Sequence, residues 1–383
     1  MDKSRRRRIL AAALLISAAT VSRASGAAAD ASGVLAEFNV EPGAEFVLLP
    51  VRVGGKELPF LLDTGSTLSV FDRSLSSAAA VARVAVGAPA GDPVMKGLHP
   101  PPEAFVGGLD MRPSGPVLYN DFSALRAVSD RDVWGMIGMQ FLKDYIVQVD
   151  LDAGIVRFLD PKTRPRPDWG SAVPMRDDHF GVPRVRAEID GIGPVDFEFD
   201  TGDNGGGNLA HSLFDRVFPA GSAVRGNNLF FTGLKSSRLG RVERLSLGNL
   251  AFHGVVFGAA GLSSLGMAFA RRSAITFDFP HATLYLKPGK RFDSPEDSDM
   301  SGLHLLRRDG RIVAMSIDSG SPADRAGIVT GDVIAGVPGR PDAVRDLVAL
   351  RRLLCSGDGR TVSLSIFRGD QTIPVELTLH KFL

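Results

Sequence analysis

The sequence has a single cysteine, Cys355, which excludes an internal disulfide and a cysteine-rich metal site. Because Cys355 lies in an apolar, helix-like stretch, we interpret it as a buried structural thiol rather than a nucleophile. The seven histidines are scattered, and none has the spacing of a zinc-binding motif. There is also no phosphate-binding glycine loop. We therefore expect no metal ion and no other cofactor.

An excess of charge of either sign is also lacking. Lys and Arg number 44 against 43 Asp and Glu, which gives a net charge of +1. No long basic run occurs outside the extreme N-terminus, so the charge pattern gives no indication of nucleic-acid binding. With 44% hydrophobic and 23% charged residues among 383, the chain can form two or three domains with substantial cores.

The N-terminus has the pattern of a targeting signal. A basic stretch at residues 5–8 precedes an apolar segment at residues 9–21 and a small-residue cleavage site at residues 27–29. The apolar segment is too short to span a bilayer comfortably, and no other segment could do so. We expect a signal peptide over residues 1–29 and a mature protein in the periplasm or outside the cell. The alternative is an uncleaved segment that anchors the chain.

The tripeptide Asp-Thr-Gly occurs twice, at residues 63–65 and at residues 200–202. Each copy follows an apolar, strand-like run and precedes a polar turn. Residues 46–62 and residues 182–199, which lead into the two copies, both read as a strand, a glycine turn and a second strand that ends at the aspartate.

The two copies match again further along the chain. Residues 134–159 and residues 262–286 each contain an apolar stretch with a Leu-Gly or Ile-Gly pair, a short helix and a hairpin. In both hairpins the first strand ends in aspartate. Such repetition indicates a duplicated structural unit that extends from about residue 35 to about residue 290.

These motifs resemble those of the retropepsin and pepsin families of aspartic peptidases, over about two thirds of the chain. The resemblance implies a mainly β fold with two retropepsin-like closed β lobes, joined as in bacterial retropepsin-like proteins and arranged as in pepsin. It implies catalysis by Asp63 and Asp200, which meet at a pseudo-twofold axis. It also implies support from the neighbouring residues, namely Thr64, Gly65, Ser66, Thr201, Gly202 and Asp203.

Two adjacent carboxyl groups suit peptide hydrolysis because they cannot both ionise cheaply. One stays protonated while the other acts as a base toward water, and the pair titrates as a unit. Gly65 and Gly202 allow tight turns near the carboxylates. In the families, the residues that match Thr64 and Thr201 hydrogen-bond across the lobe interface. The alternative is that both tripeptides are ordinary turns, for which Asp-Thr-Gly is also suited.

Asp203 departs from the family pattern. Family members usually have Ser, Thr or Ala after the glycine, and Ser66 fits this pattern. A third carboxylate beside the pair is repulsive, and costly if it is desolvated. Three glycines at residues 205–207 add a large ordering cost to the same loop. The sequence leaves open whether Asp203 points to solvent, alters the titration of the pair or marks a degenerate lobe.

The families close a flap over the substrate, and such a hairpin excludes water and aligns the substrate. In each lobe the flap should lie between the two repeated motifs. Residues 84–95 are the candidate in the first lobe, and residues 227–234 in the second.

The C-terminal part resembles a bacterial PDZ domain. Residues 287–299, which contain Pro, Asp and Ser, indicate a linker. After them come Gly-Leu-His-Leu at residues 302–305, a short helix capped by Ser321, and an amphipathic helix over residues 342–355. A final hairpin completes the pattern of a β domain with two helices.

In the PDZ family, a loop that matches residues 302–305 binds a terminal carboxylate, and the peptide adds to the neighbouring strand. The resemblance therefore implies that protein C-termini or extended peptides bind at a groove. Its residues would be Gly302, Leu303, His304, Leu305 and Leu347. The alternative is a domain kept for packing or for dimerisation.

Taken together, the sequence predicts a signal peptide at 1–29, a first lobe at 30–160, a second lobe at 161–290, and a linker and PDZ domain at 291–383. The predicted function is that of an exported aspartic endopeptidase that acts on peptides or proteins. The alternative is a catalytically weak pseudo-peptidase that binds peptides through the PDZ domain.

Overall fold

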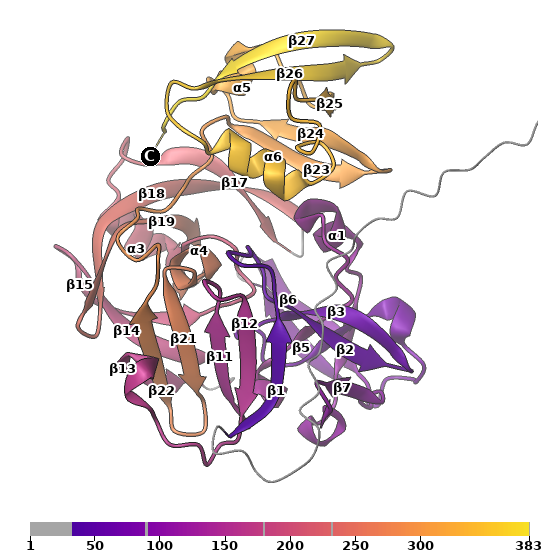
Figure 1. Cartoon of the computed structure of the whole chain (residues 1–383), viewed down its shortest axis with the longest axis vertical. Helices are drawn as coiled ribbons and strands as arrows, with labels where there is room; N and C mark the ends of the chain where they lie inside the picture. Colours follow the sequence, from indigo (N-terminus) through magenta and orange to yellow (C-terminus); the bar gives the residue numbers. More distant parts are fainter. Residues whose placement is uncertain (1–32, 89–90, 179–180, 231–232, 383) are drawn as a thin grey trace, which may run out of the picture.

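The computed structural model describes residues 33–88, 91–178, 181–230 and 233–382, and its backbone is mainly β (Figure 1). The expected signal peptide at residues 1–29 lies outside the described residues. Within the described ranges, no helix is both long enough and apolar enough to cross a membrane. Three sheets and a separate hairpin build a two-lobed body and a C-terminal module.

A seven-stranded sheet forms the first lobe. In spatial order its strands are β8 (Leu109–Asp110), β7 (Ala104–Val106), β2 (Leu48–Val53), β3 (Lys56–Leu62), β10 (Gly135–Ile137), β4 (Val70–Asp72) and β9 (Leu118–Asn120). The helices of this lobe are α1 (Ser123–Ser129) and α2 (Met139–Leu142), with 3-10 turns at Arg73–Leu75 and Arg112–Ser114. The predicted glycine turn joins β2 to β3, where Gly54 and Gly55 both have positive φ, as a two-residue hairpin loop requires.

The second lobe belongs to a thirteen-stranded sheet. In spatial order its strands are β1 (Val34–Asn39), β12 (Ile155–Leu159), β11 (Ile146–Asp150), β21 (Ser273–Asp278), β22 (Thr283–Pro288), β13 (Ser171–Asp177), β14 (Pro183–Ile189), β15 (Gly193–Phe199), β20 (Ser264–Leu265), β16 (Gly207–Ala210), β19 (Leu250–Ala260), β18 (Gly233–Leu247) and β17 (Val224–Phe230). Its helices are α3 (His211–Val217) and α4 (Met267–Ala270), with a 3-10 turn at Pro167–Trp169.

The two halves of the body share this large sheet. Strand β11 from the first repeat pairs antiparallel with β21 from the second, and Val147 lies opposite Phe277. Both strands belong to the hairpins that the repeat predicted after the short helices. Backbone hydrogen bonds thus join the lobes directly, which fixes one half of the body relative to the other.

The strand topology confirms the duplication seen in the sequence. In the first repeat, β3 runs parallel to β10, with Leu62 beside Ile137. In the second, β15 runs parallel to β20, with Phe199 beside Leu265. Each parallel pair is extended by a short antiparallel strand, β4 or β16. Each Asp-Thr-Gly therefore follows the first strand of the same local arrangement, β3 or β15.

Phenylalanine side chains form much of the core of the body. Phe60 packs edge-to-face on Phe71 with ring centroids 5.0 Å apart, and Phe199 packs in the same way on Phe277 at 5.2 Å. All four side chains are fully buried. Truncating one such ring to alanine costs about 3–5 kcal/mol. These rings lie on or beside the strands that carry the aspartates, so they fix the backbone from which the site is built.

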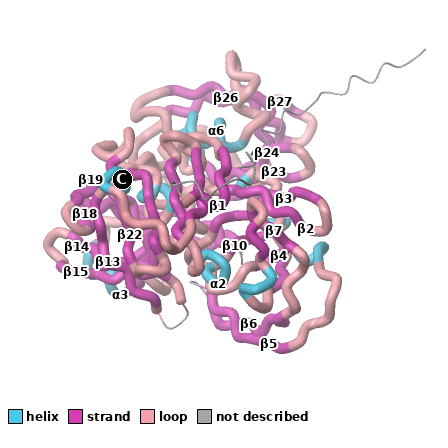
Figure 2. The backbone as a smooth tube through the Cα atoms, turned by 60° about the horizontal axis from the view of Figure 1, so that its bottom comes forward, coloured by secondary structure: helices cyan, strands magenta, loops and turns pink. Residues whose placement is uncertain are grey.

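Both predicted flap segments form antiparallel hairpins. In the first lobe, β5 (Ala82–Ala88) pairs with β6 (Gly91–Leu98), and in the second, β17 pairs with β18. Figure 2 shows the β5–β6 hairpin at the edge of the molecule, far from β26 and β27. Val94 and Met95 on β6 are exposed apolar residues, at 56% and 50%. The hairpin form is confirmed, whereas its role as a flap stays a prediction.

The C-terminal module has one antiparallel sheet and two helices, above the body in Figure 1. Its strands are β23 (Leu303–Arg308), β24 (Arg311–Ile317), β25 (Val333–Gly336), β26 (Thr361–Arg368) and β27 (Gln371–Thr378), and its helices are α5 (Pro322–Arg325) and α6 (Leu347–Leu354). Ser321 caps α5, as predicted. The second helix begins at Leu347 rather than at residue 342, because the Asp346 carboxylate accepts from the Val348 N–H and sets the start there.

Candidate active site

The structure brings Asp63 and Asp200 together at the interface of the lobes. A hydrogen bond between their side chains is one of the contributions to the pKa of Asp63. The crossing is reciprocal: a Cβ at Gly65 would lie 2.5 Å from Asp200 Cγ, and a Cβ at Gly202 would lie 2.7 Å from Asp63 Cγ. Any larger residue at either glycine would collide with the opposite carboxyl group. The glycines are thus required by close approach across the interface.

Thr64 and Thr201 tie the two loops together behind the carboxyl groups. The Thr64 N–H donates to Thr201 Oγ1 at 3.0 Å, and the Thr201 N–H donates to Thr64 Oγ1 at 3.1 Å. The Thr201 hydroxyl donates to the Leu62 carbonyl at 2.7 Å, and the Thr64 hydroxyl donates to the Phe199 carbonyl. Both threonines are buried. The network crosses the interface four times, so it fixes the spacing of the aspartates.

The environment of the pair favours retention of a proton. Burial raises the pKa of Asp63 to about 6, although hydrogen bonds from the Gly65 N–H and from Asp200 oppose this. The pKa of Asp200 is raised well above its usual range. Burial is the largest cause, the negative charge of Asp63 is the second, and that of Asp203 is the third. The Gly202 N–H donates to Asp200 Oδ1 at 2.9 Å and partly offsets these effects. The pair thus retains a proton more readily than ordinary carboxyl groups, and Asp203 adds a negative charge on the Asp200 side.

Asp203 turns inward, toward its own loop. Its Oδ1 accepts from the Gly205 N–H at 2.8 Å, and its Oδ2 accepts from Asn208 Nδ2 at 2.9 Å. Asn208 Nδ2 also lies 3.2 Å from Ser264 Oγ. Burial raises the pKa of Asp203 despite these hydrogen bonds. Of the three possibilities left open by the sequence, the structure supports an effect of Asp203 on the titration of Asp200.

The first lobe organises the matching loop differently. Ser66, at the position of Asp203, donates through its hydroxyl to the Leu68 carbonyl at 2.8 Å. The backbones nevertheless correspond: the Met139 N–H donates to the Ser66 carbonyl at 2.8 Å, and the Met267 N–H donates to the Asp203 carbonyl at 2.7 Å. The helices α2 and α4 therefore hold the two loops alike. The site is asymmetric because the side chains differ and because the second loop has one extra residue, between Asp203 and Gly205.

Two residues near the site escaped prediction. Asn208 binds Asp203, and its closeness in sequence to the second Asp-Thr-Gly was a weak signal. Glu296 lies in the segment interpreted as a linker. Its carboxyl group fills the space beside Gly206, where an added Cβ would lie 2.1 Å from Glu296 Oε2. Nothing in the sequence around Glu296 marks it as a neighbour of this loop.

The expected peptide-binding residues of the C-terminal module lie at the starts of β23 and α6. Leu303, Leu305 and Leu347 are buried in the core of the module. His304 Nε2 lies 3.0 Å from Asp318 Oδ1. Gly302 precedes β23, and its N–H donates to Asp299 Oδ2 at 2.5 Å. The three leucine side chains therefore serve as core residues.

The region between β23 and α6 is covered in this structure. Arg351 on α6 donates to the Leu305 carbonyl on β23 at 2.7 Å, and α1 of the first lobe packs against β23 (Figure 1). Asp130, which ends α1, accepts from the Leu347 N–H at 2.9 Å and forms a bidentate ion pair with Arg307. The module is thus docked on the first lobe through polar contacts at the place where a peptide would add.

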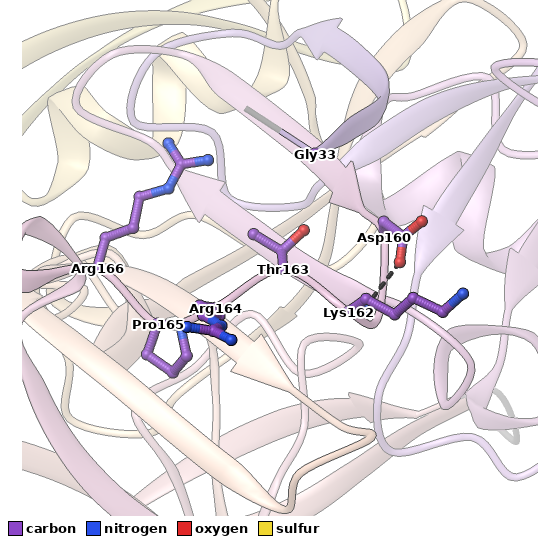
Figure 3. Close-up of a pocket in the computed structure, with 7 residues that line it drawn as sticks. All are labelled: Gly33, Asp160, Lys162, Thr163, Arg164, Pro165 and Arg166. Atoms are coloured by element: carbon purple, nitrogen blue, oxygen red, sulfur yellow. Dashed lines mark hydrogen bonds between the residues drawn. The ribbon is translucent and has the colours of Figure 1, made fainter. Parts of the chain in front are cut away.

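Among the described residues, no cluster of His, Cys, Asp and Glu side chains could hold a metal ion. A pocket lies elsewhere, in the connection between β12 and β13 (Figure 3). It is lined by Gly33, Asp160, Lys162, Thr163, Arg164, Pro165 and Arg166. Asp160 Oδ1 accepts from the Lys162 N–H there at 2.8 Å. Neither residue of the aspartate pair lines this pocket, so it is separate from the site.

Comparison with known proteins gives similarity in structure but not in sequence. No family model matches the chain, and no curated protein matches its sequence. Among solved structures, the chain is similar to an aspartic proteinase from Irpex lacteus, with 13% sequence identity and a TM-score of 0.44. The match covers 67% of this chain and 98% of that chain.

Proposed function

We propose that the protein is an aspartic endopeptidase whose catalytic residues are Asp63 and Asp200. The observation that carries the proposal is the approach of two carboxyl groups, one from each repeat, across the lobe interface, with Asp63 buried and Asp200 half-buried. Such a pair shares one proton and so presents a base and an acid side by side. The threonine network behind it supplies the rigidity that this chemistry needs.

In the proposed mechanism, Asp63 is the base and Asp200 is the acid. Asp63 takes a proton from a water molecule as its oxygen attacks the peptide carbonyl, while Asp200 gives its proton to the carbonyl oxygen. The tetrahedral diol then collapses: a proton passes to the leaving nitrogen, the C–N bond breaks, and a carboxylic acid and an amine are released. The negative charge of Asp203, on the Asp200 side of the pair, favours a protonated Asp200 and supports these roles.

The test is digestion of a peptide library by the purified mature protein, from about pH 3 to about pH 8. Asp63→Asn and Asp200→Asn should each lower turnover more than about a thousandfold, and the double variant should be no worse than either. Asp144→Asn is the matched control, because Asp144 is an exposed residue outside the site. Substantial turnover in either aspartate variant would refute the assignment.

A second candidate is peptide binding by the C-terminal module, which would act as a PDZ domain on a weak or inert peptidase body. The observation in its favour is that β23 is an edge strand, which pairs only with β24 among the described strands. Peptide addition would require α1 of the first lobe to move away from β23. Fluorescence polarisation with peptides that have free or amidated C-termini tests it. A preference for the free carboxylate would support this function, and equal or absent binding would refute it.

We further propose export of the protein with loss of residues 1–29, and a division into lobes at 30–160 and 161–290 and a linker and PDZ domain at 291–383. The basic, apolar and small-residue pattern at the N-terminus supports export. N-terminal sequencing of the mature protein tests it. A mature chain that begins at residue 1 would contradict signal cleavage and leave the anchored alternative.

A further inference from the structure

Residues 289–302, here called the connecting segment, are held against the second lobe. The Glu296 N–H donates to the Gly254 carbonyl at 3.1 Å, and the Glu296 carbonyl accepts from Arg241 Nη1 at 3.0 Å. Phe292 packs on the buried Phe252 with ring centroids 5.0 Å apart. These contacts fix the backbone on both sides of Glu296, so its side chain is delivered to a defined place.

The carboxyl group of Glu296 ends the pairing between two strands of the second lobe. Strand β16 pairs with β19 from Asn208, opposite Gly258, onward. Before that point, the Val256 N–H on β19 donates to Glu296 Oε2 at 3.0 Å. A Cβ at Gly206 would lie 2.1 Å from the same oxygen. Glu296 therefore occupies the gap between Gly206 and the edge of β19.

The first lobe has a side chain at the equivalent place. The Gln140 N–H donates to the Thr67 carbonyl at 2.9 Å, and the Ala268 N–H donates to the Gly205 carbonyl at 2.9 Å, so Leu68 corresponds to Gly206. Gly206 has no side chain, and the carboxyl group of Glu296 lies where one would begin. A residue distant in sequence thus occupies the place of a side chain that the second repeat lacks.

The loop beside Glu296 needs such support. It contains three consecutive glycines, residues 205–207, whose ordering is costly. Gly205 is held by Asp203, and the carbonyl of Gly206 accepts from the Gly266 N–H at 3.0 Å. A displaced Gly206 would shift Asp203 and, through the same loop, Asp200. Catalysis is sensitive to errors of this size, because a misplacement of about 1 Å can cost roughly a hundredfold in rate.

Four charged groups interact with Glu296. Arg241, Arg271 and Arg272 favour its ionised form, and Asp203 opposes it. Burial has the largest effect and, against the hydrogen bond from the Val256 N–H, raises the pKa of Glu296 to about 7. The side chain is therefore neutral in acid, where it adds no charge beside Asp203.

We propose that Glu296 is a positioning residue for the loop that carries Asp200, and that it acts as the substitute for the side chain missing at Gly206. The catalytic part of this inference rests on the proposed peptidase function. The role also makes the connecting segment part of the site, since removal of residues 289–302 would remove support from the second aspartate.

The test compares Glu296→Ala with Glu296→Gln near pH 5, where wild-type Glu296 is mostly neutral and charge differences are small. Glutamine keeps an acceptor for the Val256 N–H and fills the gap beside Gly206. We expect alanine to lower kcat about tenfold or more with little change in KM, and glutamine to stay near wild type. Glu57→Ala is the matched control, because Glu57 is an exposed glutamate of the first lobe outside the site.

Either of two results would overturn the proposal. One is a wild-type kcat in Glu296→Ala, and the other is a decrease of kcat in Glu296→Gln as large as that in the alanine variant. If the alanine variant does not fold, Glu296→Leu replaces it, because leucine fills the gap but cannot accept from Val256. We expect the same loss of kcat in that variant.

A second readout separates this inference from the peptidase proposal. In protein with ¹³C-labelled aspartate, the carboxyl signals of Asp200 and Asp203 report the loop whether or not the protein cleaves peptides. We expect them to shift near pH 5 in Glu296→Ala and to stay unchanged in Glu296→Gln. An inert wild-type protein would refute the peptidase function alone. Unchanged signals in the alanine variant would refute the positioning role.

Discussion

Thr64 and Thr201 each donate a backbone N–H to the side-chain oxygen of the other, at 3.0 and 3.1 Å, across the interface of the two lobes. Each hydroxyl also donates to a backbone carbonyl of the opposite repeat. Each hydroxyl therefore links two backbone groups of the other lobe, and the two Asp-Thr-Gly loops cannot shift independently.

Replacing either threonine by alanine should destabilise the body and impair the site. Thr64→Ala leaves the buried Thr201 N–H and the Phe199 carbonyl without their partner, which costs about 1–3 kcal/mol for each unsatisfied group. Thr64→Ser keeps the hydroxyl and should lose much less. Urea unfolding measures the difference. Thr67→Ala is the control, since Thr67 is exposed, and an equal effect there would contradict the role of the network.

Removing the charge of Asp203 should shift the titration of the aspartate pair. Its negative charge raises the pKa of Asp200, so Asp203→Asn should lower that pKa and move the alkaline limb of the pH–rate profile toward acid. Asp203→Ser should shift the profile likewise, and should also lose about 1 kcal/mol of stability because its bonds to Gly205 and Asn208 disappear. An unchanged profile in both variants would show that this charge does not affect the pair.

Glu296 should make stability depend on pH. Its pKa is about 7 in the folded protein against 4.5 ordinarily, so its neutral form is favoured on folding. This contribution is complete below about pH 4.5 and is lost as the pH rises to about 7, by at most about 3 kcal/mol. Unfolding curves of the wild type and Glu296→Gln should therefore diverge over this interval, with the variant the more stable at the upper end. Parallel curves would contradict the raised pKa.

Asp130 and Arg307 should hold the C-terminal module on the first lobe. Burial raises the pKa of Asp130, but hydrogen bonds from Arg307 and the Leu347 N–H outweigh it, and the pKa is lowered overall. The pair should thus persist until strong acid. Asp130→Asn and Arg307→Ala should each loosen the module, with a coupling energy of about 1–3 kcal/mol in a double-mutant cycle.

Small-angle scattering and limited proteolysis within residues 289–302 would detect this release of the module. Asp132→Asn is the matched control, because Asp132 lies close by in the sequence but is exposed. Scattering profiles that are identical for wild type, Asp130→Asn and Arg307→Ala would show that other contacts hold the module in place.

Local pattern was enough for the sequence to predict much of the body. The two copies of Asp-Thr-Gly, the strands before them and the short helices after them all follow from apolar periodicity and glycine turns within a few residues. The hairpins at β5–β6 and β17–β18 follow in the same way. The helix predicted from residue 342 begins only at Leu347. Apolar periodicity does not show where a helix starts, and here the start is set by one side chain, Asp346, which accepts from the Val348 N–H.

Other features have no local signature. Asp203 could be recognised as unusual, but its inward orientation depends on Asn208 and on the N–H of Gly205. Glu296 reads as one more acidic residue in a polar segment. Its place beside Gly206 depends on how the chain returns along β19 after it has completed both lobes.

The sequence by itself determined that two carboxylates are presented on matching turns, because a duplicated pattern of strands and glycines forms the same local structure twice. Only the tertiary structure decided how the surroundings of the two carboxyl groups differ. Burial and charge depend on which groups come within reach, and the fold turns Asp203 inward and brings the distant Glu296 to the same loop. Burial and the negative charge of Asp203 therefore favour the neutral form of Asp200, an effect that no pattern in the sequence around it could give.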